Sequence, residues 1–268
     1  MTSKLNAMPA RKTLANLARH WLKAIGIRSV TKTVYGAPLR IPLAMGELRS
    51  LLFDPAYSPF FNEEEVMDVL AARMRADDVV FDIGAYHGVW AVLLARHARE
   101  VVAFEPNPGS FEVLKETIAV NRARNVSASS VAIGGESSTA DFWGTGSGAS
   151  LRQGEHRHSR SRVQVETLDA FAEGRASMPD VIKIDVEGAE HQVLTGARRC
   201  LAHARLVCIE VHYDELPKFG ADYPMVNSLM TEAGYVEIMR SRPMRLGAED
   251  PTRLHLILEK KSEVGKAG

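Results

Sequence analysis

Apolar runs that alternate with a helix-like stretch mark residues 79–107 as the unit around which the chain is organised. An apolar run at 79–81 ends in Asp82, and a second at 101–104 ends in Glu105. The pattern predicts a strand, a turn, a helix and a second strand. Because ligands of open parallel sheets bind outside the carboxyl ends of the strands, we expect both acids at one edge.

The predicted turn after Asp82 contains two glycines, Gly84 and Gly88. Glycine adopts positive φ and lets a ligand approach the backbone closely, and a helix that begins near Gly88 points free N–H groups at that ligand. Glu105 follows Asp82 by about 20 positions, where an acid can accept both ribose hydroxyls of a nucleoside. Tyr86 departs from the dinucleotide pattern, which places a glycine against the pyrophosphate. A nucleoside without phosphates fits better, and S-adenosylmethionine is such a ligand.

Hydrophobic periodicity outside this unit predicts further alternating strands and helices, and therefore an α/β fold. Before the unit we expect strands at 31–35 and 39–43 and a helix capped by Asn62. After it we expect a helix from Pro108, strands at 127–133 and 140–143, a strand and short helix within 163–173, a strand at 181–187, a helix from Gly188 to Arg199, a strand at 206–212, a helix at 223–233, and strands at 235–239 and 253–259.

The length and composition favour an ordinary globular chain. Its 268 residues suit an N-terminal extension, 1–60, and one main domain, 61–268. The formal net charge is zero, so we expect no general attraction to nucleic acid or membranes. Cys200 and Cys208, the two cysteines, suit a reduced, cytoplasmic protein. We expect no membrane span, since no apolar run of about 18 residues occurs, and no signal peptide, since the N-terminus lacks an apolar h-region.

Residues 10–25 have apolar side chains at helical spacing, with basic residues elsewhere. One interpretation is a helix that contacts a membrane surface or a partner. The other, which we favour, is a helix packed on its own domain or on a second copy of the chain in a homo-oligomer. The apolar positions are Leu14, Leu17, Trp21, Leu22 and Ile25.

A loop at 151–162 is rich in arginine and histidine. Its cations would suit an anionic acceptor beneath a lid, and a solvated surface loop is the equally weighted alternative. The histidines of this loop have no matching cysteine or acid spacing, so we expect no metal site there. The residues concerned are Arg152, His156, Arg157, His158, Arg160 and Arg162.

Charged residues alternate with apolar ones at the end of the strand at 181–187, and Glu210 and His212 end the next strand. A charged face on an inner strand is costly unless it is paired. Glu210 could therefore pair with Lys183 and take no part in chemistry. Likewise, His212 could be a hydrogen-bonded strand-end histidine, and Glu187 could complement the dipole of the next helix.

Five segments together resemble the FkbM-type family of S-adenosylmethionine-dependent methyltransferases. They are VFDIGAYHG (80–88), VVAFEPNP (101–108), ETLDAF (166–171), IKIDVEGAE (182–190) and CIEVH (208–212). The resemblance covers roughly residues 60–260. It implies a doubly wound, Rossmann-like, seven-stranded and mostly parallel sheet with an antiparallel last strand. It also implies O-methylation of a hydroxyl on a sugar, a glycan or a polyketide-type product.

Residues of two kinds follow as candidates for the site. A sugar hydroxyl is a poor nucleophile, so a base should help; we favour His212, with Asp185 orienting the acceptor or lining the cofactor, and Glu210 beside them. In a rival arrangement Asp185, Glu210 or His212 holds a divalent ion, for which magnesium suits oxygen ligands. We expect the cofactor to contact Asp82, Gly84, Ala85, Tyr86, Gly88, Glu105, Pro106, Asn107, Ala132 and Asp185.

Two other functions compete with this interpretation. The first is a non-catalytic module that keeps the fold and docks to a partner or membrane through residues 10–25. The second is a nucleic-acid methyltransferase, which zero net charge disfavours because such enzymes need a continuous basic face.

Overall fold

The computed structural model describes most of the chain and the whole of its central sheet. The described residues are 21–22, 24–45, 63–143, 151, 160–242 and 253–261. Most of the expected helix at 10–25, the capping residue Asn62 and most of the loop at 151–162 lie outside them. Within the described part, no helix is long and apolar enough to cross a membrane.

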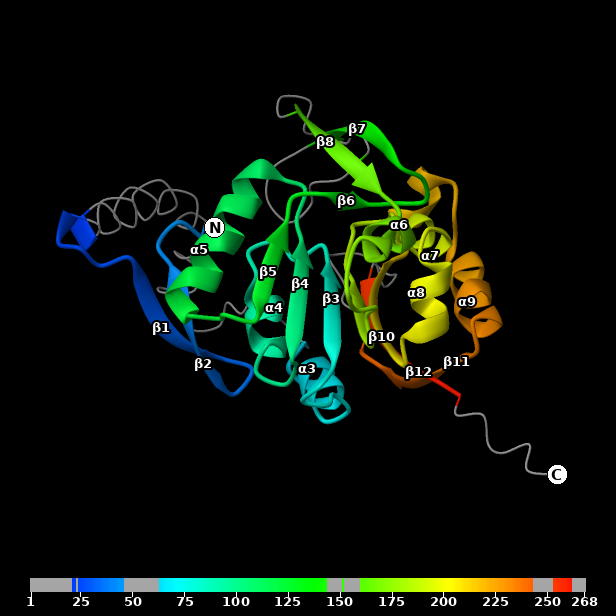
Figure 1. Cartoon of the computed structure of the whole chain (residues 1–268), viewed down its shortest axis with the longest axis horizontal. Helices are drawn as coiled ribbons and strands as arrows, with labels where there is room; N and C mark the ends of the chain where they lie inside the picture. The colour runs from blue at the N-terminus through cyan, green and yellow to red at the C-terminus, as the bar shows by residue number, and fades with distance from the viewer. Residues whose placement is uncertain are drawn as a thin grey trace, which may run out of the picture.

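A seven-stranded sheet forms the centre of the molecule (Figure 1). Its order is β11-β12-β10-β9-β3-β4-β5. Strand β12 runs antiparallel to both of its neighbours, and the pairs from β10 to β5 are parallel. The doubly wound sheet with an antiparallel last strand is thus confirmed. The strands are β3 Val79–Ile83, β4 Glu100–Phe104, β5 Val126–Ser129, β9 Val181–Ile184, β10 Leu206–His212, β11 Tyr235–Arg240 and β12 Arg253–Lys260.

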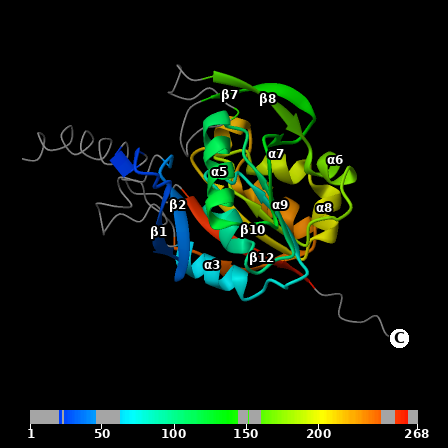
Figure 2. The ribbon, with the colours of Figure 1, turned by 60° about the vertical axis from the view of Figure 1, so that its left-hand side comes forward.

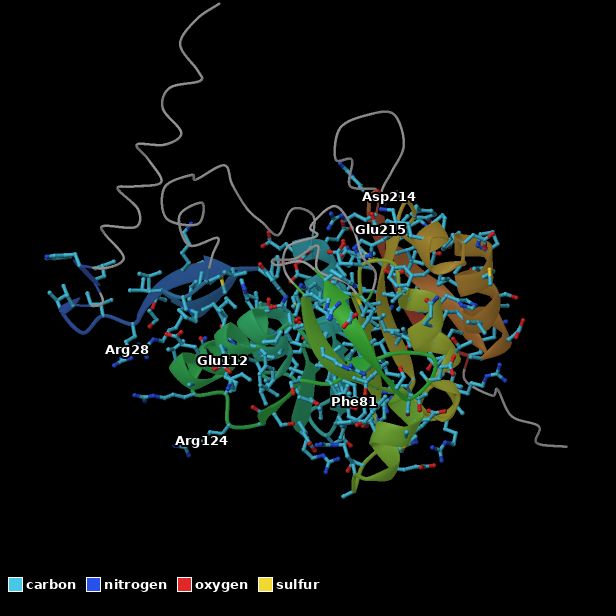
Figure 3. All side chains as sticks on the ribbon, turned by 90° about the horizontal axis from the view of Figure 1, so that it is seen from above. Arg28, Phe81, Glu112, Arg124, Asp214 and Glu215 are labelled. Carbon is cyan, nitrogen blue, oxygen red and sulfur yellow. The ribbon has the colours of Figure 1, made fainter. Side chains whose placement is uncertain are left out.

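Helices cover both faces of this sheet. Successive residues of each inner strand point to opposite faces, and because most of them are apolar, both faces must be buried. Val80 packs with α3, α4 and α5, whereas Phe81 packs with α6, α7, α8 and α9. Seen from above, Phe81 lies inside the molecule, whereas Arg28 and Arg124 lie at its surface (Figure 3). The helices are α3 Glu63–Ala71, α4 Val89–Leu94, α5 Pro108–Asn121, α6 Leu168–Glu173, α7 Glu190–Thr195, α8 Arg198–His203 and α9 Tyr223–Glu232, with a 3₁₀ turn, η1, at Leu216–Phe219.

Helix α5 begins as the sequence predicts. The Asn107 side chain accepts hydrogen bonds from the backbone N–H groups of Gly109 at 2.9 Å and Ser110 at 3.1 Å, and Pro108 occupies the first helical position. Such a cap is worth about 1 kcal/mol and fixes the direction of the chain. It therefore also holds the segment that follows Glu105.

An N-terminal hairpin packs against α5 (Figure 2). Its strands, β1 Ser29–Val34 and β2 Ala37–Pro42, match the two short strands that the sequence predicts. Leu39 and Ile41 are fully buried in the core that α5 shares, and the Asn121 side chain hydrogen-bonds both the N–H and the C=O of Arg40. The hairpin is thus built into the core of the main fold.

The expected strand at 127–133 divides into two, so that prediction was wrong in its extent. Strand β5 ends at Ser129, and β6 Ala132–Ile133 belongs to a separate three-stranded sheet. The reason is non-local, because β6 pairs in parallel with β8 Arg160–Glu166, which in turn pairs with β7 Ser138–Trp143.

The expected helix from Gly188 to Arg199 also divides. Helix α7 ends at Thr195, and α8 begins at Arg198. The Asp169 carboxylate accepts hydrogen bonds from the N–H groups of Arg199 and Cys200, and so supplies a new helix start. Asp169 lies on α6, so a distant side chain causes a break that local periodicity does not reveal.

Candidate active site

The turn after β3 is tied to the ends of both neighbouring strands. The N–H groups of Gly84 and Ala85 donate to the Phe104 carbonyl at 3.0 and 2.8 Å, and the Asp185 N–H donates to the Ile83 carbonyl at 3.0 Å. Gly84 has φ 80°, and a Cβ there would overlap the carbonyl oxygen of Asp185. Only glycine fits this position, which brings the ends of β3, β4 and β9 together.

Glu105 lies directly beside this turn, as the sequence predicts. Its carboxylate accepts hydrogen bonds from the N–H of Tyr86 at 2.9 Å and the N–H of Asn107 at 2.8 Å. The residue is 6% exposed, and burial raises its pKa to about 7 although the two N–H groups act in the opposite direction. Each carboxylate oxygen has the capacity for a second hydrogen bond, so the group can accept two hydroxyls.

Asp82 is paired within the protein. It is fully buried, with Oδ1 3.2 Å from Nζ of Lys183, which lies 3.4 Å from the Asp185 carboxylate. Although burial acts in the opposite direction, these two acids raise the pKa of Lys183. Among the described residues, Lys183 forms ion pairs with Asp82 and Asp185, and its neighbour on β10 is Cys208, so the expected pairing with Glu210 is not found.

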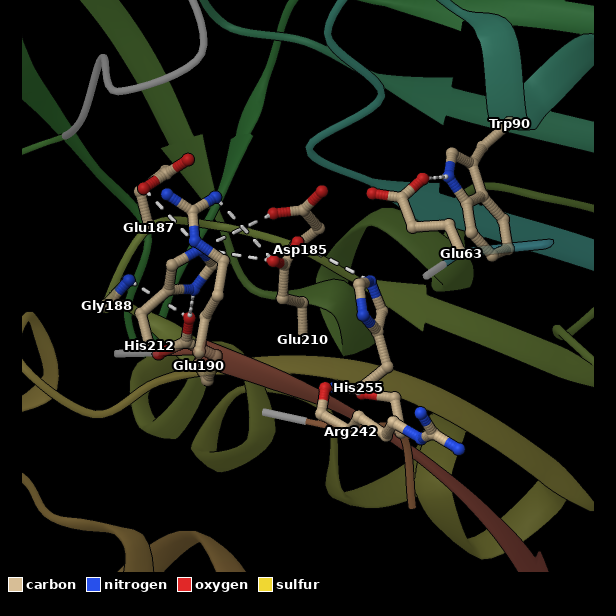
Figure 4. A network of polar contacts seen from close by, with 12 residues as sticks. Glu63, Trp90, Asp185, Glu187, Gly188, Glu190, Glu210, His212, Arg242 and His255 are labelled. Carbon is tan, nitrogen blue, oxygen red and sulfur yellow. Dashed lines mark hydrogen bonds and ion pairs between the residues drawn. The ribbon is translucent and has the colours of Figure 1, made fainter. Parts of the chain in front are cut away.

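Four polar side chains converge at the carboxyl ends of β9 and β10 (Figure 4). Nε2 of His212 lies 3.5 Å from a carboxylate oxygen of Glu187 and 4.0 Å from oxygens of Asp185 and Glu210. Glu187 has φ 50°, in the left-handed region, where strain is often retained for function. The structure thus brings together the three candidates His212, Asp185 and Glu210, and adds Glu187.

Glu190 completes this group and was missed in the sequence. Its Oε1 accepts hydrogen bonds from Nδ1–H of His212 at 2.6 Å and from the Gly188 N–H at 3.0 Å. Although burial alone would lower it, the bond to Glu190 and the charges of Glu187 and Glu190 raise the pKa of His212 to about 10. The signal was the acid that ends the segment at 182–190, which had been given no role.

A second polar group borders the first through Glu210. The other oxygen of Glu210 lies 3.5 Å from Nε2 of His255, whose pKa burial lowers to about 4. Beyond it, the Glu63 carboxylate accepts hydrogen bonds from Nε1–H of Trp90 at 2.8 Å and from the Tyr35 hydroxyl. No sequence pattern indicates this group, because its members come from five separate segments.

The remaining predicted cofactor residues lie at the start of α4, in the small sheet, and next to the turn and Glu105. Gly88, at the start of α4, has φ 80°, and a Cβ there would collide with Leu114, so the glycine also permits close helix packing. Ala132 lies in the small sheet beside β8, three residues beyond Ser129, whose carbonyl accepts the Glu105 N–H. Ala85 and Pro106 flank the turn and Glu105 along the chain.

A comparison with known protein families identifies the family of this chain. Residues 82–237, which contain Glu105, Asp185 and His212, match the methyltransferase FkbM domain. The chain belongs to the FkbM methyltransferase family. This FkbM chain is therefore an enzyme that transfers methyl groups, which confirms the resemblance drawn from its motifs. Tyr35, Glu63 and His255 lie outside the matched segment.

The chain is also similar to individual proteins of known sequence or structure. The FkbM chain is 32% identical over 181 residues to the hexuronic acid methyltransferase AglP of Haloferax volcanii, a match that covers 64% of this chain and 69% of the relative. It is 39% identical over 66 residues to an uncharacterized protein of Methanocaldococcus jannaschii, covering 25% of this chain and 24% of that one. The crystal structure of methyltransferase FkbM from Methylobacillus flagellatus matches 69% of this chain and 44% of that chain, with 18% identity and a TM-score of 0.47.

Proposed function

We propose that the protein is an S-adenosylmethionine-dependent O-methyltransferase that acts on a hydroxyl of a sugar or glycan. The observation that carries this proposal is the Glu105 carboxylate beside the Gly84 turn, at the carboxyl end of β4. An acid in that position of a doubly wound sheet accepts the hydroxyls of a ribose.

The residues present fit this methyl donor. Tyr86 stands where a pyrophosphate would need glycine, so the turn suits an adenosine without phosphates. When bound, S-adenosylmethionine supplies a methyl group on a sulfonium, and transfer to a hydroxyl oxygen breaks the carbon–sulfur bond and leaves S-adenosylhomocysteine.

The acceptor side is formed by Asp185, Glu187, Glu210 and His212. We propose that these residues hold the acceptor hydroxyl and take up its proton as the oxygen forms its new bond to carbon. Correct positioning alone lowers the barrier by about 7–11 kcal/mol in well-oriented systems. Both arrangements expected from the sequence use this group, either with His212 as the base or with a cation held among the same side chains.

A uronic acid residue is the acceptor class that we propose first. The relative in Haloferax volcanii is named for hexuronic acid, and it aligns with 64% of this chain. Arg253 lies 3.7 Å from Glu210 at the border of the acceptor group, where a guanidinium can meet the carboxylate of such a sugar.

We expect the protein to form a methyl ether on a uronic acid. Isotope-labelled S-adenosylmethionine is incubated with an aryl glucuronide and, as the matched control, the corresponding aryl glucoside. Mass spectrometry detects the added methyl group, and mild alkali distinguishes an alkali-stable ether from a labile methyl ester. An alkali-labile product would contradict O-methylation of a hydroxyl. Methylation of the glucoside alone would contradict a uronic acid as the acceptor.

Affinity for S-adenosylmethionine should depend on pH through Glu105. The ionised carboxylate accepts the ribose hydroxyls, and protonation competes with that role, so affinity falls as pH drops below the raised pKa of about 7. Between pH 8 and pH 6 the ionised fraction falls about tenfold, and the Kd should rise by about the same factor. Calorimetry at both pH values measures this change. Glu105→Gln should remove most of it; the same pH dependence in that variant would assign the effect to another group.

A further inference from the structure

The histidine at the end of β10 has one ring nitrogen that makes no hydrogen bond among the described residues. His212 is 2% exposed, and its Nε2 faces Glu187 at 3.5 Å and Asp185 and Glu210 at 4.0 Å each. A protonated imidazole bonds a carboxylate at about 2.7–2.9 Å. None of the three distances matches such a pair.

The same distances are typical of donor atoms that bind one cation between them. One donor atom each from Asp185, Glu187 and His212 lies within 4.8 Å of the others. Ligands that are bound about 2.0–2.2 Å from one divalent cation are themselves separated by roughly 3.0–4.3 Å. The distances from Nε2 of His212, 3.5 Å to Glu187 and 4.0 Å to Asp185, fall within this range.

The opposite nitrogen of His212 is held as it would be in a metal ligand. Nδ1–H donates to the Glu190 carboxylate at 2.6 Å, and Glu190 is anchored by the Gly188 N–H at 3.0 Å. Metal-binding histidines commonly donate their other ring N–H to a carboxylate, which fixes the tautomer and directs the lone pair of the first nitrogen at the ion. Glu190 thus orients Nε2 into the group of carboxylates, and a cation that binds there displaces a proton from the ring.

We infer that Asp185, Glu187 and His212 bind a divalent cation, with Glu190 as the positioning residue. Two carboxylates and one imidazole suit a first-row ion such as Mn²⁺ better than Mg²⁺, which prefers an all-oxygen set. The cation would add to the positive charge that Lys183 already supplies at 3.4 Å from Asp185 and Arg253 at 3.7 Å from Glu210. If the proposed function holds, the ion lies where the acceptor hydroxyl approaches and lowers the pKa of that hydroxyl, which replaces a free imidazole base.

The neighbouring group is a weaker candidate for the same role. Glu63, Glu210 and His255 also place one donor atom each within 4.8 Å of the others. The Glu63 carboxylate, however, already accepts hydrogen bonds from Trp90 and Tyr35. We therefore assign the ion to the side of Glu210 that faces His212.

Direct titration with Mn²⁺ tests the inference. The full chain is treated with a chelator, dialysed and titrated with Mn²⁺, and electron paramagnetic resonance measures the free ion. We expect one Mn²⁺ per chain, with affinity at least tenfold lower in His212→Ala and in the shape-conserving Glu187→Gln. The control is His203→Ala, at a half-exposed histidine on α8, and it should bind like the wild type.

Two results would contradict the proposed cation site. The first is a wild-type chain that leaves the Mn²⁺ signal unchanged, and the second is wild-type affinity in both site variants. Because the titration contains neither S-adenosylmethionine nor an acceptor, its outcome is independent of methyl transfer. A chain that binds Mn²⁺ but methylates no hydroxyl would contradict the proposed function and support the cation site. A chain that methylates a hydroxyl but does not bind Mn²⁺ would support the proposed function and contradict the cation site.

Discussion

Replacement of His212 by alanine should lower turnover at least ~100-fold while the affinity for S-adenosylmethionine changes less than about twofold. A base or a metal-activated hydroxyl contributes roughly 10²–10⁴ in rate, and either arrangement loses its central group in this variant. The adenosine contacts expected at Glu105 are made by another strand. Turnover therefore separates from cofactor binding.

The measurement is kcat with a saturating acceptor, together with calorimetry of S-adenosylmethionine on the same preparation. His203→Ala serves as the control, and both variants should retain the wild-type circular dichroism spectrum. Glu190→Gln gives a second readout, because loss of the positioning carboxylate should lower kcat with little change in KM. Equal losses of turnover and cofactor affinity in His212→Ala would assign the histidine a purely structural role.

Replacement of Glu105 by alanine should weaken S-adenosylmethionine binding at least tenfold, or about 1.4 kcal/mol. The carboxylate is held in place by the N–H groups of Tyr86 and Asn107, so it is already oriented before the ligand arrives. Hydrogen bonds to a charged acceptor are worth about 1.5–3 kcal/mol each, and the variant loses those to both ribose hydroxyls. The effect should exceed that of most other single changes at the turn.

Calorimetry measures this change against Glu112→Ala, an exposed acid one helical turn into α5. Glu105→Gln keeps the shape but not the charge, and should fall between the wild type and Glu105→Ala. Unchanged affinity for S-adenosylmethionine in Glu105→Ala would show that this carboxylate does not bind the ribose.

The sequence predicts most of the fold because its signals are local. The run from Val79 to Glu105 places apolar strands, a turn with two glycines and a helix within one short segment, and the structure confirms all of them. The Asn107 cap is equally local. Where a distant residue decides, the sequence fails: Asp169 starts α8, and pairing with β8 draws Ala132 and Ile133 out of the expected third strand.

The same distinction applies to the site. His212, Asp185 and Glu210 were predicted because each ends an apolar strand, and parallel strands end at one edge. The ion pairs among these charged residues could not be predicted, because they depend on the register of neighbouring strands. Lys183 lies beside Asp82 of β3 and pairs with it, not with Glu210. Glu190 and Glu63 were missed because they lie on helices, where an acid in the first turn is usually explained by the helix dipole.

The central claim is that the Gly84 turn and Glu105 together hold the adenosine of S-adenosylmethionine. A crystal structure of the chain with S-adenosylhomocysteine tests it most directly. We expect both ribose hydroxyls on the Glu105 carboxylate and the sulfur facing Asp185. An adenosine bound elsewhere, with Glu105 still bonded only to the N–H groups of Tyr86 and Asn107, would contradict it.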